Sequence, residues 1–139
     1  MAAGIAPWSA TLSPTYRLTD MYKYLAYAAY GWLATTGVLH FIVDVMSQYL
    51  HGKREPSLET SLYYGLNSAF SLGQLAFGVL GLMFVWRAMG PQVEAPVFVL
   101  SILAGLGWLV ITFLFMEYWE PKLMVGIFCI LILGAYVTH

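Results

Sequence analysis

Charged side chains are scarce in this chain of 139 residues, and their scarcity excludes most water-soluble folds. Lys, Arg, Asp and Glu make up 9% of the residues, against about 25% in a typical soluble domain. Hydrophobic residues make up 60%, and the mean hydropathy is +0.74. Because so few charges cannot solvate the surface of a globule, the sequence predicts a protein whose surface faces lipid.

The chain also lacks an excess of basic residues and a second cysteine. Six Lys and Arg against seven Asp and Glu give a formal net charge of -1, whereas proteins that bind nucleic acids carry a basic patch or stripe. Cys129 alone cannot form an intrachain disulfide or the paired thiols of a zinc or redox site. We therefore expect no nucleic-acid partner and no thiol chemistry within one chain.

Long apolar runs are what the sequence has instead. A membrane-spanning helix needs about 20 mostly apolar residues, and polar or proline-containing segments separate four such runs. We predict an all-α, polytopic membrane protein with a four-transmembrane-helix bundle as its single domain, residues 21–139. The expected helices cover about 21–50, 57–89, 96–118 and 121–137. Residues 1–20 have no sustained apolar core of the kind a signal peptide requires, so we expect them to form an N-terminal surface arm.

Local signals support these boundaries. Ser57 with Thr60 offers capping chemistry at the start of the second helix, and Gly90-Pro91 is expected to end it. Pro96 and Pro121 each suit the first turn of a helix and are expected to open the third and fourth.

The orientation in the membrane does not follow from the charges. An even number of spans puts both ends of the chain on one side, and the side richer in Lys and Arg is usually cytoplasmic. Three basic residues fall on each side: Arg17, Lys23 and Arg87 on one, and Lys53, Arg54 and Lys122 on the other. We therefore expect an integral, multi-pass membrane protein with neither its orientation nor its membrane fixed.

The most informative polar residues inside a span are His40 and Asp44. An ionisable residue within a membrane span is costly and usually faces the bundle interior. Four residues separate the two, so they share one helix face, where a carboxylate can fix and polarise an imidazole. The alternative is a structural hydrogen-bonded pair, worth about 0.6 kcal/mol in a membrane bundle. The spacing favours a catalytic, proton-handling pair over that alternative.

Further polar residues follow helical spacing on the second and third helices. Counted from the membrane side that carries the 51–56 loop, they lie at depths similar to that of His40. The sequence therefore predicts a polar pocket in one half of the bundle. Its ligand-binding residues are expected to be Asn67, Ser71, Gln74, Trp108 and Thr112, with Glu117 at the mouth. The alternative for the polar members is interhelical hydrogen bonding without a ligand.

Metal and haem chemistry find little support. A catalytic metal needs about three converging protein ligands, and His40 and Asp44 supply two. A bis-histidine haem site would need a second buried histidine, but His51 lies in a loop and His139 is the last residue. We expect no metal and no cofactor, which leaves proton transfer within an apolar ligand site as the chemistry open to the pair.

The run Gly37-Val38-Leu39-His40-Phe41-Ile42-Val43-Asp44 resembles the first-helix segment of the EXPERA superfamily, the emopamil-binding protein and sigma-2 receptor group. In that family an acid follows a buried histidine by one turn. The run Ile111-Thr112-Phe113-Leu114-Phe115-Met116-Glu117 is similar to the end of the family's third helix. Asn67 and Gln74 fall where the family often places acids. The resemblance covers residues 24–117.

This resemblance implies a four-helix bundle with a membrane-accessible cavity for sterol-like ligands or amphipathic amines. In the isomerase branch, a histidine and acids move a proton across a sterol double bond, and His40 and Asp44 would be that pair. Gln74 replaces an acid of this branch, and residues 123–137 lack its fourth-helix polar residues. The resemblance therefore implies ligand binding more directly than isomerase activity.

Three functions are compatible with the sequence. The first is an integral membrane protein that binds a hydrophobic or amphipathic small molecule or a membrane lipid around His40 and Asp44, with isomerase-like proton transfer as an extension. The second is an accessory subunit of a larger membrane complex, for which the short loops and the apolar fourth helix are the motivation. The third is a proton-coupled transporter that works as a homo-oligomer. We rank them in this order.

Overall fold

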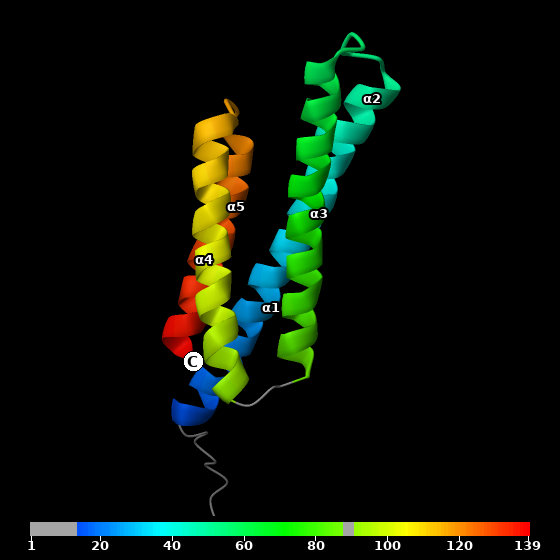
Figure 1. Ribbon diagram of the computed structural model, residues 1–139. Coiled ribbons are helices and arrows are strands. Elements are labelled where there is room, and N and C mark those ends of the chain that lie inside the picture. The colour runs from blue at the N-terminus through cyan, green and yellow to red at the C-terminus, as the bar shows by residue number, and fades with distance from the viewer. Residues whose placement is uncertain (1–13, 88–90) are drawn as a thin grey trace, which may run out of the picture.

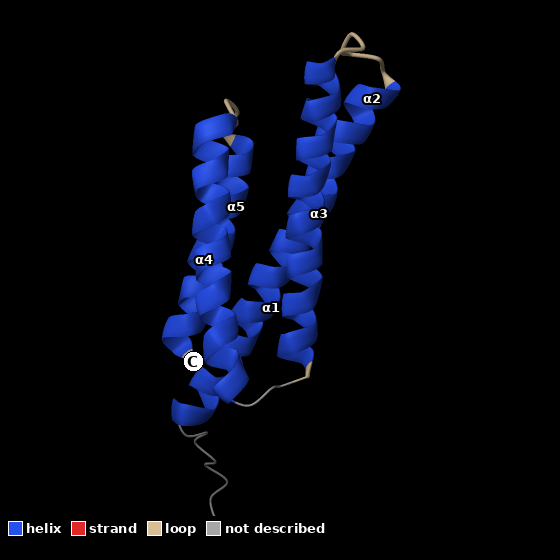
Figure 2. Ribbon diagram, in the orientation of Figure 1, coloured by secondary structure: helices blue, strands red, loops and turns tan. Residues whose placement is uncertain are grey.

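The computed structural model describes residues 14–87 and 91–139, and within these ranges every element is helical (Figures 1 and 2). Four of the helices are long and apolar enough to cross a membrane. They are Met21–Leu50, Leu58–Trp86, Glu94–Phe115 and Glu120–Thr138. The predicted all-α class with four transmembrane helices is thereby confirmed.

The first span consists of three consecutive helical segments. An α-helix, α1 (Pro14–His40), continues into a π-helix, η1 (Phe41–Ser47), and then into a short α-helix, α2 (Gln48–Leu50). Helix α1 begins at Pro14, whereas the sequence predicted a start near residue 21, so residues 14–20 are helical rather than part of an arm. A proline is well suited to a first helical position. Residues 1–13 of the expected arm lie outside the described residues.

The second span, α3 (Leu58–Trp86), begins at the predicted cap. Ser57 has extended backbone angles, and its hydroxyl accepts a hydrogen bond from the backbone N–H of Thr60 at 3.1 Å. This bond satisfies one of the backbone donors that a helix start leaves unpaired. In the preceding loop, Gly52 has a φ of 58°, which a residue without a side chain adopts at little cost.

The third span, α4 (Pro91–Phe115), starts earlier than expected, and the fourth is α5 (Glu120–Thr138). Pro91 begins α4 and Pro96 lies inside it, so the expectation that Pro96 opens this helix was wrong. A proline in the second turn of a helix removes one backbone hydrogen bond close to the N-terminus. Neighbouring helices make this loss tolerable in a membrane. Pro121 lies in the first turn of α5, as expected.

Helix α1 is the central element of the bundle. It packs against α3 on one side and α5 on the other, and α4 packs against α5 (Figure 1). The buried core lies along this central helix and comprises Ala26, Ala29, Tyr30, Leu33, Phe98, Phe128, Ile132 and Ala135. Gly78 of α3 brings the backbones close together, because a Cβ there would lie 2.8 Å from the carbonyl oxygen of Tyr30.

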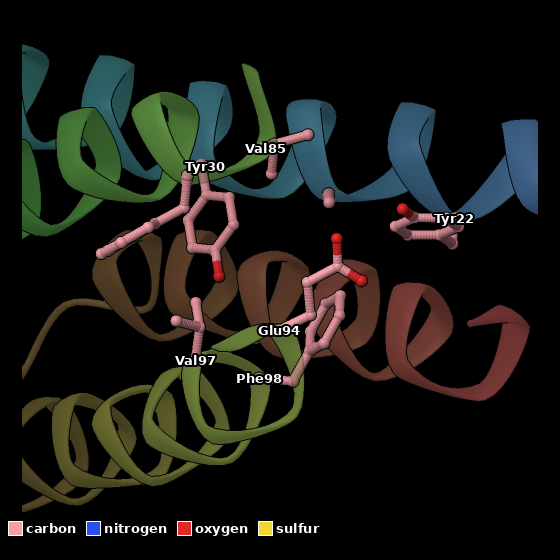
Figure 3. Close-up of a pocket in the computed structure, with 8 residues that line it drawn as sticks. Tyr22, Tyr30, Val85, Glu94, Val97 and Phe98 are labelled. Carbon is pink, nitrogen blue, oxygen red and sulfur yellow. The ribbon is translucent and has the colours of Figure 1, made fainter. Parts of the chain in front are cut away.

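The bundle is closed at the end that carries the C-terminus. There Tyr22, Glu94 and Phe98 surround a cavity of about 30 Å³, room for about one water molecule (Figure 3). The hydroxyl of Tyr30, also in this wall, is 2.8 Å from Oγ of Ser101. This end of the molecule is therefore packed nearly solid.

Toward the opposite end the helices separate. Helix α3 and the upper part of the first span diverge there from the α4–α5 pair (Figure 1). The rings of Phe77 in α3 and Trp108 in α4 still meet edge to face, with centroids 5.5 Å apart. Beyond this contact, on the side of the 51–57 loop, the space between the two pairs of helices holds the candidate site.

Candidate functional site

The site is built around His40 and Asp44 on the first span. His40 is the last residue of α1 and Asp44 lies in η1, where Nδ1 of the imidazole is 2.9 Å from Oδ2 of the carboxylate. Their side chains are 9% and 25% exposed, respectively. Segments of π-helix within α-helices are rare and frequently occur at functional sites. Here the π-helix carries the acidic member of the pair.

Asn67 of α3 completes a three-residue network. Its Oδ1 is 3.1 Å from Nε2 of His40, and its Nδ2 donates to the carbonyl oxygen of Tyr63 at 2.8 Å. Because a carbonyl oxygen only accepts, this second bond identifies the NH₂ end of the amide and leaves Oδ1 to face the histidine. The imidazole therefore contacts Asp44 of its own span through Nδ1 and Asn67 of α3 through Nε2.

These contacts place an acceptor oxygen at each nitrogen of the imidazole, Oδ1 of Asn67 at Nε2 and Oδ2 of Asp44 at Nδ1. An N–H of the ring can donate to either oxygen. The distance between Nδ1 and Oδ2 is short enough for a proton to pass between the imidazole and the carboxylate.

A cavity of about 740 Å³ adjoins this network. Its wall is formed by η1, α3, α4 and the segment that leads into α5, and apolar and aromatic side chains make up most of it. The lining residues are His40, Asp44, Tyr63, Leu66, Asn67, Ala69, Phe70, Trp108, Ile111, Phe115, Met116, Tyr118 and Pro121. The volume falls within the range of about 300–1,000 Å³ typical of small-molecule sites.

The cavity opens sideways as well as toward the loop end. Leu66 is 68% exposed and Phe115 is 78% exposed, although both line the cavity. In a membrane, side chains this exposed on spanning helices contact acyl chains. A second cavity, of about 370 Å³, is also lined by His40 and Asp44, together with residues such as Gln48 and Glu120. The pair thus forms part of the wall of both cavities.

Four of the predicted site residues meet in this place. His40, Asp44, Asn67 and Trp108 all line the large cavity. The polar pair of the first span and the polar residues of α3 are in contact through His40 and Asn67.

The other four predicted residues lie outside the described lining, contrary to expectation. Ser71 and Gln74 are 2% and 3% exposed because they face the close contact of α3 with Gly37 of α1. Thr112 is fully buried, and its hydroxyl donates to the carbonyl oxygen of Leu109. Glu117 is exposed at the end of α4. For Ser71, Gln74 and Thr112, small rotations about the helix axes, which sequence spacing leaves undetermined, turn the side chains away from the cavity. Glu117 lies beyond Phe115, where α4 ends.

Several lining residues were absent from the sequence prediction although a signal for them existed. Tyr63 and Phe70 lie four residues before and three residues after Asn67, so they share its helix face. Ile111 and Phe115 follow Trp108 at the same kind of spacing. Apolar and aromatic residues at helical spacing usually mark core packing, so their role as a cavity wall depends on the separation of the helices.

Within residues 21–87 and 94–139, no group of three His, Cys, Asp or Glu side chains is placed to hold a metal ion. What the arrangement offers is a hydrogen-bonded His–Asp pair at the side of an apolar cleft. No family model matches the chain, and no curated protein or solved structure matches it either. The resemblance to the EXPERA superfamily therefore rests on the motifs quoted above.

Proposed function

We propose that this multi-pass membrane protein binds a hydrophobic or amphipathic small molecule, or a membrane lipid, in the cavity beside His40 and Asp44. The observation that carries the proposal is that the polar pair and the cavity lie side by side. The one described ion pair lying deep within the spans, with the amide that orients it, borders the largest described cavity. Polar groups inside a membrane span are costly, and they usually serve a substrate or ion pathway.

The chemistry of the wall supports a guest that is mostly apolar with one polar group. Phe70, Trp108 and Phe115 offer aromatic surface, whereas the polar atoms come from the network of His40, Asp44 and Asn67. Ligand sites commonly combine an apolar lining with a few placed polar groups that fix orientation. The exposed side chains at the lateral opening are compatible with entry from the bilayer.

Acid–base catalysis on the bound guest extends the proposal. The contact between Nδ1 of His40 and Oδ2 of Asp44 lies at the cavity wall, where a general acid must lie to reach its substrate. An isomerase-like proton transfer of the kind implied by the EXPERA resemblance would use this pair. Binding is the prior requirement, and it is tested first.

A photoactivatable hexadecanol, added to the purified full chain in nanodiscs, tests binding directly. We expect mass spectrometry to find the label on the cavity faces of α3 and α4. Ala69→Trp should fill the cavity and reduce this labelling about tenfold, the factor for 1.4 kcal/mol of lost affinity. Ala76→Trp is the matched control, because Ala76 is exposed on the same helix and outside the described lining. Labels spread evenly around all four spans, with no effect of Ala69→Trp, would contradict the proposal.

Asp44→Asn tests the part played by the polar pair. The amide has nearly the shape of the carboxylate but carries no charge, so the hydroxyl of a bound hexadecanol loses a charge-assisted partner. Such a hydrogen bond contributes about 1.5–3 kcal/mol, and we expect competition by unlabelled hexadecanol to weaken at least tenfold. The variant should remain monodisperse in detergent. Unchanged competition in both Asp44→Asn and His40→Ala would remove the pair from the site.

A further inference from the structure

An exposed arginine stacks on a residue that lines the large cavity. Arg54 lies in the 51–57 loop, and its guanidinium carbon is 3.6 Å from the ring centroid of Tyr63, a lining residue. Its Nε donates to Oε1 of Gln48 at 3.2 Å. Stacking on the ring and this hydrogen bond hold the plane of the guanidinium. Its two terminal nitrogens then carry the remaining donors, in the planar geometry that suits a carboxylate or a phosphate.

The bonding continues from Arg54 to the cavity wall. Because Oε1 of Gln48 accepts from Arg54, the NH₂ end of the amide faces away and donates to the Tyr63 hydroxyl oxygen at 3.1 Å. The hydroxyl of Tyr63 is thus an acceptor in this chain, and its own hydrogen remains to be donated. No hydrogen bond donated by this hydroxyl is formed within the described side chains. Arg54 and Tyr63 together present unused donors at the cavity mouth.

The guanidinium of Arg54 favours an anion, because no carboxylate of the described side chains forms a salt bridge with it. The loop end as a whole has no excess of positive charge, since Glu55 and Glu59 match Lys53 and Arg54 in number. Asp44 is the only acid among the described lining residues of the large cavity, and its carboxylate contacts His40. The preference for an anion therefore comes from one unpaired guanidinium, stacked on a ring that lines the cavity.

The apolar part of the cavity extends inward from this mouth. Along α3 the lining runs from Tyr63, nearest the loop, to Phe70. Seven residues of helix separate the two, or about 10 Å at 1.5 Å per residue. Phe115 and Trp108 continue the apolar wall on α4.

We infer that the guest of this cavity is a single-chain amphiphile with an anionic head group, a carboxylate or a phosphate. Its head accepts hydrogen bonds from Arg54 and Tyr63, and its chain lies between Phe70 and Phe115. This inference rests on the proposed function and narrows it to a class of ligand.

Three photoactivatable probes with the same chain and different heads test the inference: palmitic acid, hexadecanol and hexadecylamine. In nanodiscs of phosphatidylcholine, we expect the acid to label the cavity at least tenfold more efficiently than the alcohol or the amine. One charge-assisted hydrogen bond is enough for that factor. Lysophosphatidate should displace the acid, because its head presents the same kind of acceptor. Inorganic phosphate should not displace the acid, because it lacks a chain. Displacement by inorganic phosphate would contradict the inference that the guest is an amphiphile.

Two variants locate the head group, with the neighbouring charge as a control. Arg54→Gln and Tyr63→Phe should each reduce labelling by the acid about tenfold, a clearly larger reduction than either causes for the alcohol. Lys53→Gln removes an equal charge without the stacked geometry, and we expect it to change the acid labelling less than threefold. Equal labelling by acid and alcohol, unaffected by Arg54→Gln, overturns the anionic head while the proposed function stands. If no probe labels the cavity, the proposed function itself fails.

Discussion

The imidazole of His40 is held from three directions. Asp44 contacts one nitrogen, Asn67 contacts the other, and the ring of Phe70 meets the imidazole edge to face with centroids 5.3 Å apart. A ring fixed at both nitrogens and against an aromatic neighbour has little freedom to turn. Its two nitrogens are therefore held in fixed positions, as the proposed acid–base chemistry requires.

At the same scale, Gly78→Ala should destabilise the fold. Its Cβ would lie 2.7 Å from the backbone nitrogen of Ala34 and 2.8 Å from the carbonyl oxygen of Tyr30, so the two helices would have to move apart. Overpacking of this kind costs about 1–3 kcal/mol. Gly73→Ala is the control on the same helix, because a Cβ there meets nothing within 4 Å. Thermal unfolding in detergent should show a lower midpoint for Gly78→Ala only. Equal midpoints for the two variants would mean that α1 and α3 are not in this close contact.

At the scale of single elements, α1 connects the two halves of the bundle. It packs on α3 through glycine and on α5 through larger side chains, and the indole nitrogen of Trp32 donates to the carbonyl oxygen of Met124 at 2.9 Å. Without these contacts the α4–α5 pair would have only side chains of α3 such as Phe77 to pack against. The interface between α1 and α5 therefore sets where the second wall of the cavity stands.

Trp32→Phe should weaken this interface. The variant keeps most of the apolar contact but loses the hydrogen bond, at a cost of about 0.6–1 kcal/mol. We expect a small decrease in the thermal midpoint in detergent. Trp86→Phe serves as the control, because Trp86 is 75% exposed and should change the midpoint little. A decrease as large for Trp86→Phe as for Trp32→Phe would exclude a specific role of the indole bond.

Local sequence signals predicted the helices and their starts better than they predicted the irregular features within the helices. The cap at Ser57 and the first-turn proline of α5 act within one turn, so the sequence predicts them. The π-helix Phe41–Ser47 and the inclusion of Pro96 within α4 depend on how neighbouring helices support the backbone. The pairing of His40 with Asp44 belongs to the first kind, whereas the position of Thr112 away from the cavity belongs to the second.

At the scale of the whole molecule, the start of α1 and the end of α5 lie at the same end of the bundle, as four spans require (Figure 1). The 51–57 loop and the turn between α4 and α5 then lie on the opposite membrane face. In a background in which Cys129 is replaced by Ser, Glu55→Cys and Arg87→Cys should react with a membrane-impermeant maleimide from opposite sides of sealed vesicles. Reaction of both from the same side would contradict the four-span arrangement.

The cleft is also a property of the whole molecule, and the sequence could not predict it. Spacing indicates which residues share a face of one helix, and it correctly brought Asn67 and Trp108 to the level of His40. How far α3 stands from α4 depends on the packing of all the helices together. The aromatic residues of the wall, such as Phe70 and Phe115, therefore looked like ordinary core residues until the separation of the helices was known.

Because the cavity opens laterally at Leu66 and Phe115, the affinity of a guest is measured relative to the bilayer and not relative to water. A guest that arrives from the bilayer is already dissolved in hydrocarbon, so exchanging acyl chains for aromatic walls yields little free energy. The apolar lining then admits many molecules with nearly equal partition coefficients. In the proposed function, discrimination among them would fall to the few polar atoms at His40, Asp44, Asn67, Tyr63 and Arg54, each of which would exchange a headgroup or interfacial water for a defined partner.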